Sequence, residues 1–325
     1  MISALKQAMI SVDQLEHSVA FYQNILGFEV ILKSDIQAGM VERLWQLPEG
    51  TKAELVVLAK SGIQWGQIRL VKFFPKSKTI IREKANNYDP GIFDIAFLGE
   101  DATKTDTILK QEGIGCSEIG MYDIPDYENM RLREILAKGL DGVAIAFLHY
   151  DPPYKPKNLK EFSEVLHSVV IVADMQRSIW FYRDLLEMDP ETDMMMDNDT
   201  VRHIIGTPKD TVIRMVSLRR QKGFTGRIML FQFLNTDGQP LGGTDYASES
   251  VPPNIGLCLL AFDTDDISEL ESRFQKNDIE IVCPPRTLDV KFFGHRRVMT
   301  VKSPEGTLLE FTENNISKSS TKKTW

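Results

Sequence analysis

Histidine, cysteine and carboxylate side chains are the groups in this sequence best suited to metal binding, proton transfer or nucleophilic chemistry. The three cysteines are scattered, without a close pair at metal-binding spacing, so the sequence predicts core-filling thiols in a reducing compartment (Cys116, Cys258 and Cys283). Among the five histidines, His167 begins an apolar run. The other four are predicted in a helix, at a linker edge and in two middle strands (His17, His149, His203 and His295). Any site must therefore be assembled by the fold, from residues distant in sequence.

Glu310 is the most informative carboxylate. It lies in an alternating run that predicts a strand, with Leu309 and Phe311 on one face and Glu310 and Thr312 on the other. A glutamate in such a strand usually faces water, and a lone histidine at the start of a strand is usually a satisfied surface or core residue. A functional interpretation therefore depends on whether the elements bring His167 and Glu310 together.

The chain repeats itself at an offset of about 160 residues. SVAFYQNILGFE (18–29) superposes on SIWFYRDLLEMD (178–189), and GQIRLVKFF (from Gly66) superposes on GRIMLFQFL (from Gly226). The loop 236–253 is longer than its counterpart, and after it the offset becomes 165. Each half splits again, which predicts four strand–helix–strand–strand–strand modules near 4–75, 89–150, 164–235 and 254–313. A Pro- and Lys-rich linker is expected at 149–162.

Helix signals accompany each module. Asp13 and Asp174 are candidate caps before apolar residues at helical spacing, and Gly27 suits the residue after the first helix. Two further helices are predicted near 101–112 and 265–277. These elements alternate with short runs rich in Val, Ile, Leu and Phe, which are typical of strands.

Composition narrows the class of protein. The 325 residues carry 38 basic and 46 acidic side chains, a net charge of −8 without a basic stripe, which argues against nucleic-acid binding. No apolar run reaches the length of a membrane helix, and the first residues do not resemble a secretion signal. We therefore expect a cytoplasmic protein with a small-molecule partner and no membrane or nucleic-acid partner. The sequence leaves open whether it is a monomer or a homodimer.

The four modules, with LHSVVIVADMQRSIWFYRDLL (166–186) and SPEGTLLEFTE (303–313), resemble the vicinal oxygen chelate superfamily, which includes glyoxalase I, the extradiol dioxygenases and the bleomycin-resistance proteins. The resemblance covers nearly the whole chain. It implies an α+β fold in which four βαβββ modules pair into two cup-shaped mixed-sheet domains, at 1–150 and 151–325, with a polar tail from about 314. In that family, metal ligands project into each cup from the first and last strands of each module.

The resemblance defines four ligand positions per half. The N-terminal half offers no carboxylate and no imidazole, so that cup is predicted to hold no metal (Gln7, Lys72, Ile92 and Ala146). The C-terminal half offers a reduced set (His167, Gln232, Leu257 and Glu310). There an imidazole, a carboxylate and an amide oxygen could hold a divalent ion such as Zn, Ni, Mn or Fe. We predict His167, Glu310 and Gln232 as metal ligands.

The corresponding reaction is that of a glyoxalase-type lyase or isomerase acting on a small oxygen-rich substrate in the C-terminal cup. Substrate oxygens would displace metal-bound water, and Glu310 would serve as both ligand and catalytic base. Substrate binding is predicted for residues near that cup (Gln232, His203, His295 and Arg297).

Two other functions remain open from the sequence. One is a metal-free enzyme that uses only polar residues of the cup. The other is a metal-free protein that binds or sequesters a drug or metabolite, with aromatic residues such as Trp45, Trp65 and Trp180 available to line its cup. An extradiol dioxygenase is disfavoured, because Leu257 stands where that reaction needs a second imidazole.

Overall fold

Each of the four predicted modules forms a strand, a helix and three further strands in the computed structural model, which describes residues 1–124, 130–151, 161–220 and 225–314. Module one contains β1 (Gln7–Ser11), α1 (Leu15–Asn24), β2 (Glu29–Ile36), α2 (Glu42–Trp45), β3 (Lys52–Ala59) and β4 (Gln67–Phe74). Module two contains β5 (Gly91–Leu98), α3 (Ala102–Gln111), β6 (Gly120–Asp123), β7 (Arg131–Lys138) and β8 (Ala144–Asp151).

The second half repeats this order. Module three contains β9 (His167–Ile171), α4 (Met175–Ile179) continued by a π-helical turn (Trp180–Leu185), β10 (Asp189–Met196), α5 (Asp199–Ile205), β11 (Val212–Arg219) and β12 (Arg227–Leu234). Module four contains β13 (Gly256–Thr264), α6 (Ile267–Lys276), β14 (Ile281–Val290), β15 (Gly294–Lys302) and β16 (Leu308–Glu313). The predicted α+β architecture is confirmed. Most of the predicted linker and nearly all of the polar tail lie outside the described residues.

Aspartate caps begin three of the four module helices. The side chains of Asp101, Asp174 and Asp266 each accept a hydrogen bond from a backbone N–H in the first turn of α3, α4 and α6. The prediction that Asp13 caps α1 is wrong, because Gln14 holds that position and makes no side-chain cap. Gly27 has the expected left-handed conformation, with φ of 69°. None of the helices in the described ranges is long and apolar enough to cross a bilayer.

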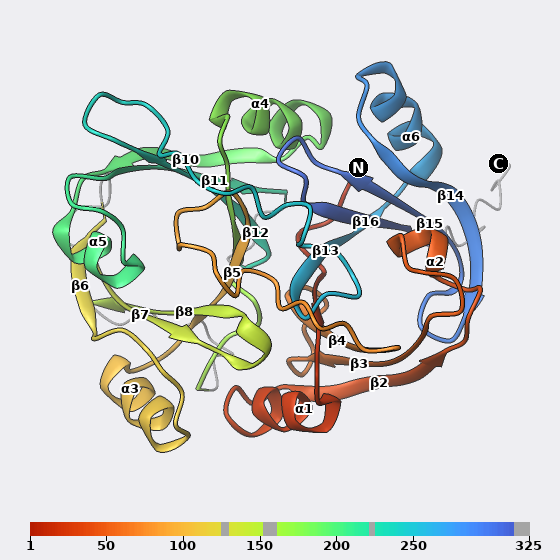
Figure 1. Cartoon of the computed structure of the whole chain (residues 1–325), viewed down its shortest axis with the longest axis horizontal. Coiled ribbons are helices and arrows are strands. Elements are labelled where there is room, and N and C mark those ends of the chain that lie inside the picture. The colour runs from red at the N-terminus through yellow and green to blue at the C-terminus, as the bar shows by residue number, and fades with distance from the viewer. Residues whose placement is uncertain (125–129, 152–160, 221–224, 315–325) are drawn as a thin grey trace, which may run out of the picture.

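The strands form two sheets of eight strands each. One has the order β14-β15-β16-β13-β1-β4-β3-β2, and the other β10-β11-β12-β9-β5-β8-β7-β6. Within each module the first strand runs parallel to the last, whereas antiparallel pairing of two first strands joins the modules, β1 with β13 and β5 with β9. Each sheet curls into a cup, and the two cups lie side by side (Figure 1).

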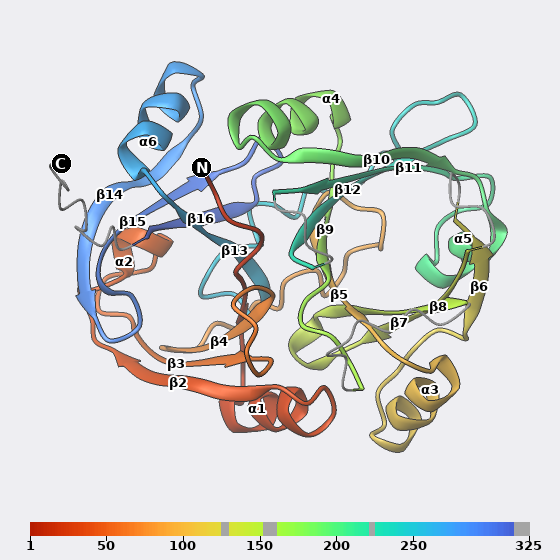
Figure 2. The same ribbon diagram turned by 180° about the vertical axis from the view of Figure 1, so that it is seen from behind.

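The two modules that share a sheet come from different halves of the sequence. The first cup combines modules one and four, and the second cup combines modules two and three. The prediction that consecutive modules pair is therefore wrong. The ranges 1–150 and 151–325 are repeat units of the sequence, and each of them contributes one module to the first cup and one to the second. Figure 2 shows the described part of the chain beginning and ending in the first cup, with the second cup formed by its middle.

Alternation along the strands separates two kinds of core. Outward residues of both cups join the helices in one shared hydrophobic cluster that includes Leu70, Tyr182 and Phe311. Inward residues form separate clusters, with Val71 and Trp45 in the first cup and Val169 and Met194 in the second. The shared cluster holds the cups together, so the inward faces are the surfaces free to differ between the two cups.

Candidate functional site

The second cup encloses a cavity of about 540 Å³. That volume lies within the range of small-molecule sites, roughly 300–1,000 Å³. Strands from both modules and helix α5 line it, and most of the lining is apolar. Five of the lining residues are methionines (Met130, Met194, Met196, Met215 and Met229). Flexible, polarizable methionine side chains adapt to irregular apolar ligands, so these walls fit a hydrophobic molecule.

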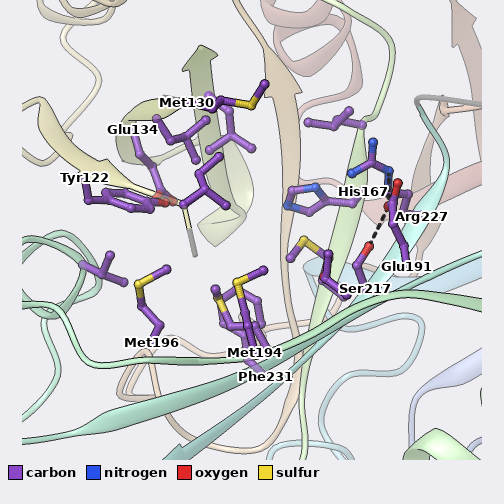
Figure 3. Close-up of a pocket in the computed structure, with 18 of the residues that line it drawn as sticks. Tyr122, Met130, Glu134, His167, Glu191, Met194, Met196, Ser217, Arg227 and Phe231 are labelled. Atoms are coloured by element: carbon purple, nitrogen blue, oxygen red, sulfur yellow. Dashed lines mark hydrogen bonds and ion pairs between the residues drawn. The ribbon is translucent and has the colours of Figure 1, made fainter. Parts of the chain in front are cut away.

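Polar groups occupy two separate parts of the cavity wall (Figure 3). In one part the Tyr122 hydroxyl donates a hydrogen bond to Glu134. Burial raises the pKa of the Glu134 carboxyl above its ordinary value, although this hydrogen bond opposes the shift. In the other part Glu191 forms ion pairs with two arginines. Its Oε1 lies 3.0 Å from Arg219 Nη1, and its Oε2 lies 3.3 Å from Arg227 Nε. Both carboxylates are therefore already engaged by protein partners.

His167 lies beside the arginine-rich part of the wall, directly opposite Arg227 in the parallel pairing of β9 with β12. Its side chain points into the cavity (Figure 3). It is 6% exposed, and its Nδ1 has no hydrogen-bond partner among the described residues. Burial, with a smaller contribution from the Arg227 charge, lowers the pKa of His167 to about 3. The ring is thus neutral at physiological pH.

This shift predicts acid sensitivity. Below pH about 6.5 the unfolded imidazole takes up a proton while the folded one stays neutral down to pH about 3. The unfolded state then binds more protons, so the free energy of unfolding falls as the pH falls. Between pH 6.5 and 4.5 we expect the free energy of unfolding of the wild type to fall by up to about 2 kcal/mol more than that of His167→Gln. Urea denaturation at both pH values measures this difference.

His295→Gln is the matched control, because the His295 side chain is 77% exposed. That variant should keep the wild-type pH dependence. An unchanged pH dependence in His167→Gln would contradict the buried neutral state of His167. His149, whose pKa burial lowers to about 4, contributes in the same direction and is left intact in both variants.

The first cup holds a buried ionic cluster. Arg69 Nη2 lies 2.7 Å from Glu310 Oε1, and the Nε and Nη2 groups of Arg69 also donate to Gln7 Oε1. Trp45 Nε1 donates to the other oxygen of Glu310 at 2.8 Å. Arg69 and Glu310 are 1% and 0% exposed. Glu310 is therefore committed to structural partners within the protein.

The structure separates the two residues on which the predicted metal site depended. His167 lies in the second cup and Glu310 in the first, so the prediction that they share one concave face is wrong. The predicted positions in β4 and β12 were also misplaced. Lys72 and Gln232 each lie two residues after a leucine of the shared outer cluster (Leu70 and Leu230), so they leave the sheet on that same outer face. Gln232 donates to the carbonyl of Ala173.

The predicted substrate-binding residues do not converge either. His203 is exposed on α5 instead of lying in a middle strand. His295 lies in β15 of the first cup, 3.9 Å from the equally exposed Asp289. Arg297 donates to Ser268 on α6, outside the cup. None of these three, and neither Gln232 nor any of Trp45, Trp65 and Trp180, lines the cavity of the second cup.

Among the described residues, neither cup offers a donor set that fits a divalent ion. In the first cup the guanidinium of Arg69 already provides the positive charge beside Glu310. Of the expected positions in the second cup, His167 faces the cavity, Ala146 lies in an inward cluster and Ile92 joins the shared outer cluster. Met229 and Phe231 are the inward residues of β12 near the missing fourth ligand. A single imidazole is too few protein ligands. No cluster of three or more histidine, cysteine or carboxylate side chains suited to a metal occurs within the described parts of the chain.

Sequence reasoning missed the residues that line the cavity, although signals for some were present. The run Asp193–Asp197 reads DMMMD, and alternation within it buries Met194 and Met196 while leaving Met195 51% exposed. The repeat also aligns Arg69 with Met229, which marks one position as ionic in the first cup and apolar in the second. Nothing in the sequence pointed to Tyr122 and Glu134, which reach the cavity through pairing between the modules.

The comparisons with known proteins agree with this architecture. The family model described as Glyoxalase/Bleomycin resistance protein/Dioxygenase superfamily matches residues 4–118 and 164–311. This chain belongs to that superfamily, as the sequence resemblance predicted. Members of the superfamily bind small-molecule substrates, and glyoxalase I and the dioxygenases commonly use divalent metals.

Solved structures match at low identity. Glyoxalase I from Zea mays is 15% identical, with a TM-score of 0.63 over 95% of this chain and 92% of that chain. A putative dioxygenase from Bacillus subtilis is 10% identical, with a TM-score of 0.58 over 97% of this chain and 86% of that chain. None of the curated proteins matches this chain. At these identities the likeness concerns the fold, and the activity must be argued from the site.

Proposed function

We propose that this chain is a metal-independent member of the superfamily that binds a small apolar molecule in the second cup. The observation that carries the proposal is the methionine-lined cavity of about 540 Å³, into which the buried His167 ring points, with an Nδ1 that has no hydrogen-bond partner among the described residues. A buried polar group without a partner costs free energy, and a bound ligand that accepts or donates a hydrogen bond removes that cost.

The geometry gives less support to the glyoxalase-type lyase or isomerase expected from the sequence. That reaction combines a metal ion, a carboxylate base and the substrate in one cup. Glu310, the predicted base, is in the first cup and bonded to Arg69 and Trp45. The carboxylates that line the cavity of the second cup, Glu134 and Glu191, are bonded to Tyr122 and to two arginines. The binding proposal needs none of them to be released.

A cavity-filling substitution tests this proposal. Met229 lies on the inward face of β12, and replacing it with Trp adds a bulky ring where the ligand would sit. With the neutral fluorescent probe N-phenyl-1-naphthylamine, we expect Met229→Trp to weaken binding at least tenfold, about 1.4 kcal/mol. Fluorescence titration measures the dissociation constant, and a thermal melt establishes that the variant is folded.

Met195→Trp is the matched control, because Met195 is 51% exposed on β10. It should bind the probe like the wild type. Equal affinity in Met229→Trp would place the probe elsewhere and overturn the proposal. Native mass spectrometry with added Zn²⁺ or Ni²⁺ tests the metal-independent part. One tightly bound equivalent of metal that disappears in His167→Ala would overturn that part and restore the metal-dependent alternative.

A further inference from the structure

The charges that line the cavity of the second cup are unevenly distributed. Arg219 and Arg227 face the same carboxylate, Glu191, and Ser217 also donates to it, at 3.2 Å. Among the described residues that line this part of the wall, two guanidinium groups face one carboxylate. The side chains of Arg227 and Glu191 are only 14% and 16% exposed, so solvent screens their charges weakly, whereas the Arg219 side chain is 36% exposed.

His167 adds a neutral polar group beside these charges. In the parallel pairing of β9 with β12, His167 and Arg227 are direct partners, so their side chains leave the sheet on the same face. The His167 ring lies beside the Arg227 and Glu191 side chains (Figure 3). A neutral imidazole has one N–H donor, and a ligand oxygen placed between His167 and the guanidinium groups would be bonded by both.

The rest of the cavity wall contains no matching cation. Of the charged residues lining the cavity within the described ranges, Glu134 is the one away from the arginines, and its partner is the uncharged Tyr122. The surface between the two polar parts is formed largely by methionine and aliphatic side chains. The cavity is thus cationic on one side and apolar across its body, which is the complement of an apolar acid.

We propose that the ligand of the second cup is an apolar organic acid whose carboxylate faces Arg219, Arg227 and His167 while its hydrocarbon or aromatic body packs among the methionines. This inference rests on the proposed small-molecule binding in the same cavity. A ligand carboxylate would accept charge-assisted hydrogen bonds from these guanidinium groups, which are stronger than neutral ones. A neutral molecule of the same shape lacks these charge-assisted bonds, and a cationic one is repelled by the two guanidinium groups.

Two probes of nearly equal shape test the inference, 2-naphthoate and its neutral amide, 2-naphthamide. At pH 7.5 we expect the wild-type chain to bind 2-naphthoate at least tenfold more tightly than 2-naphthamide, as measured by isothermal titration calorimetry. Arg219→Gln should reduce this preference to threefold or less, because the carboxylate of 2-naphthoate loses a charge-assisted donor that the amide does not use in the same way. Arg214→Gln is the matched control, because Arg214 leaves the opposite face of β11 and pairs with Asp193.

The outcomes separate the two proposals. Equal binding of 2-naphthoate and 2-naphthamide, both weakened by Met229→Trp, overturns the acid preference and leaves small-molecule binding intact. A preference for 2-naphthoate that persists in Arg219→Gln and in Arg227→Gln overturns the assignment of the cationic wall. Failure of both naphthalene probes and of N-phenyl-1-naphthylamine to bind in the cavity overturns the proposed function itself.

Discussion

Replacing Arg69 with Met is expected to lower the free energy of unfolding by about 3–5 kcal/mol, because the substitution leaves the charge of Glu310 uncompensated inside the first cup. Arg69 and Glu310 are 1% and 0% exposed. Without the guanidinium, the remaining bond to Glu310 is the one donated by Trp45 Nε1, and Gln7 Oε1 loses its donor as well. Urea denaturation followed by circular dichroism measures the change.

Arg214→Met is the matched control for this loss. Arg214 makes two bonds to Asp193, but the Asp193 side chain is 48% exposed, and a surface ion pair contributes about 0–1 kcal/mol. In the double variant Arg69→Met/Glu310→Gln the uncompensated charge is gone, so we expect part of the stability to return. Equal losses in Arg69→Met and Arg214→Met would show that the Glu310 cluster is not the buried, water-excluded pair that the structure describes.

The same cluster explains why the first cup is unsuited to a metal. A divalent ion beside Glu310 would have to displace a guanidinium that already satisfies the carboxylate, and the two cations would repel each other. Lys72 is the one cation among the positions expected from the sequence in the N-terminal half, whereas the residue that faces Glu310 is Arg69. The cation that opposes metal binding beside Glu310 is therefore Arg69 of module one. The cup in which it lies combines modules one and four.

Much of the fold could be predicted because its signals are local. Aspartates before α3, α4 and α6, and apolar residues at helical or alternating spacing, identify the elements from neighbouring residues alone. The offset of about 160 residues then shows that the elements recur. These signals come from residues within one module, so they predict its helix and strands whichever module it pairs with.

Strand faces were harder to predict, because side chains alternate with a period of two. An alignment error of an odd number of residues moves a side chain to the opposite face of the sheet. Lys72 and Arg69 differ by three positions, as do Gln232 and Met229, and in each pair the structure directs the second residue inward. The closing strands of modules one and three were aligned on short apolar runs, which do not fix the face.

Module pairing could not be predicted, because the four modules present similar edges. β1 pairs with β13, but a first strand of the same pattern was available in β5, nearer in sequence. The choice depends on contacts between modules, which a single sequence does not reveal. This choice separates His167 from Glu310 and creates the cavity from modules two and three, so the candidate site could not be derived from the repeat alone.

Crossed pairing has a large consequence for fragments of the chain. Cutting between residues 151 and 161 leaves modules one and two on one fragment and modules three and four on the other. Each fragment then lacks the partner of both its first strands, because β1 pairs with β13 and β5 with β9. Exposed strand edges and a divided hydrophobic cluster favour aggregation, so we expect neither half to give a monomer with cooperative unfolding when expressed alone.

Co-expression of the two halves should restore the structure. We expect fragments 1–151 and 161–325 to elute together as a 1:1 complex in size-exclusion chromatography with light scattering, and to melt cooperatively. The intact chain cleaved at a protease site engineered between residues 151 and 161 is the matched control. It should stay assembled because the twelve described strand pairings within modules and both pairings between modules survive the cut. A stable, monomeric 1–151 fragment with a sharp melting transition would instead show that consecutive modules can form a cup by themselves, because only pairing of β1 with β5 could then protect both edges.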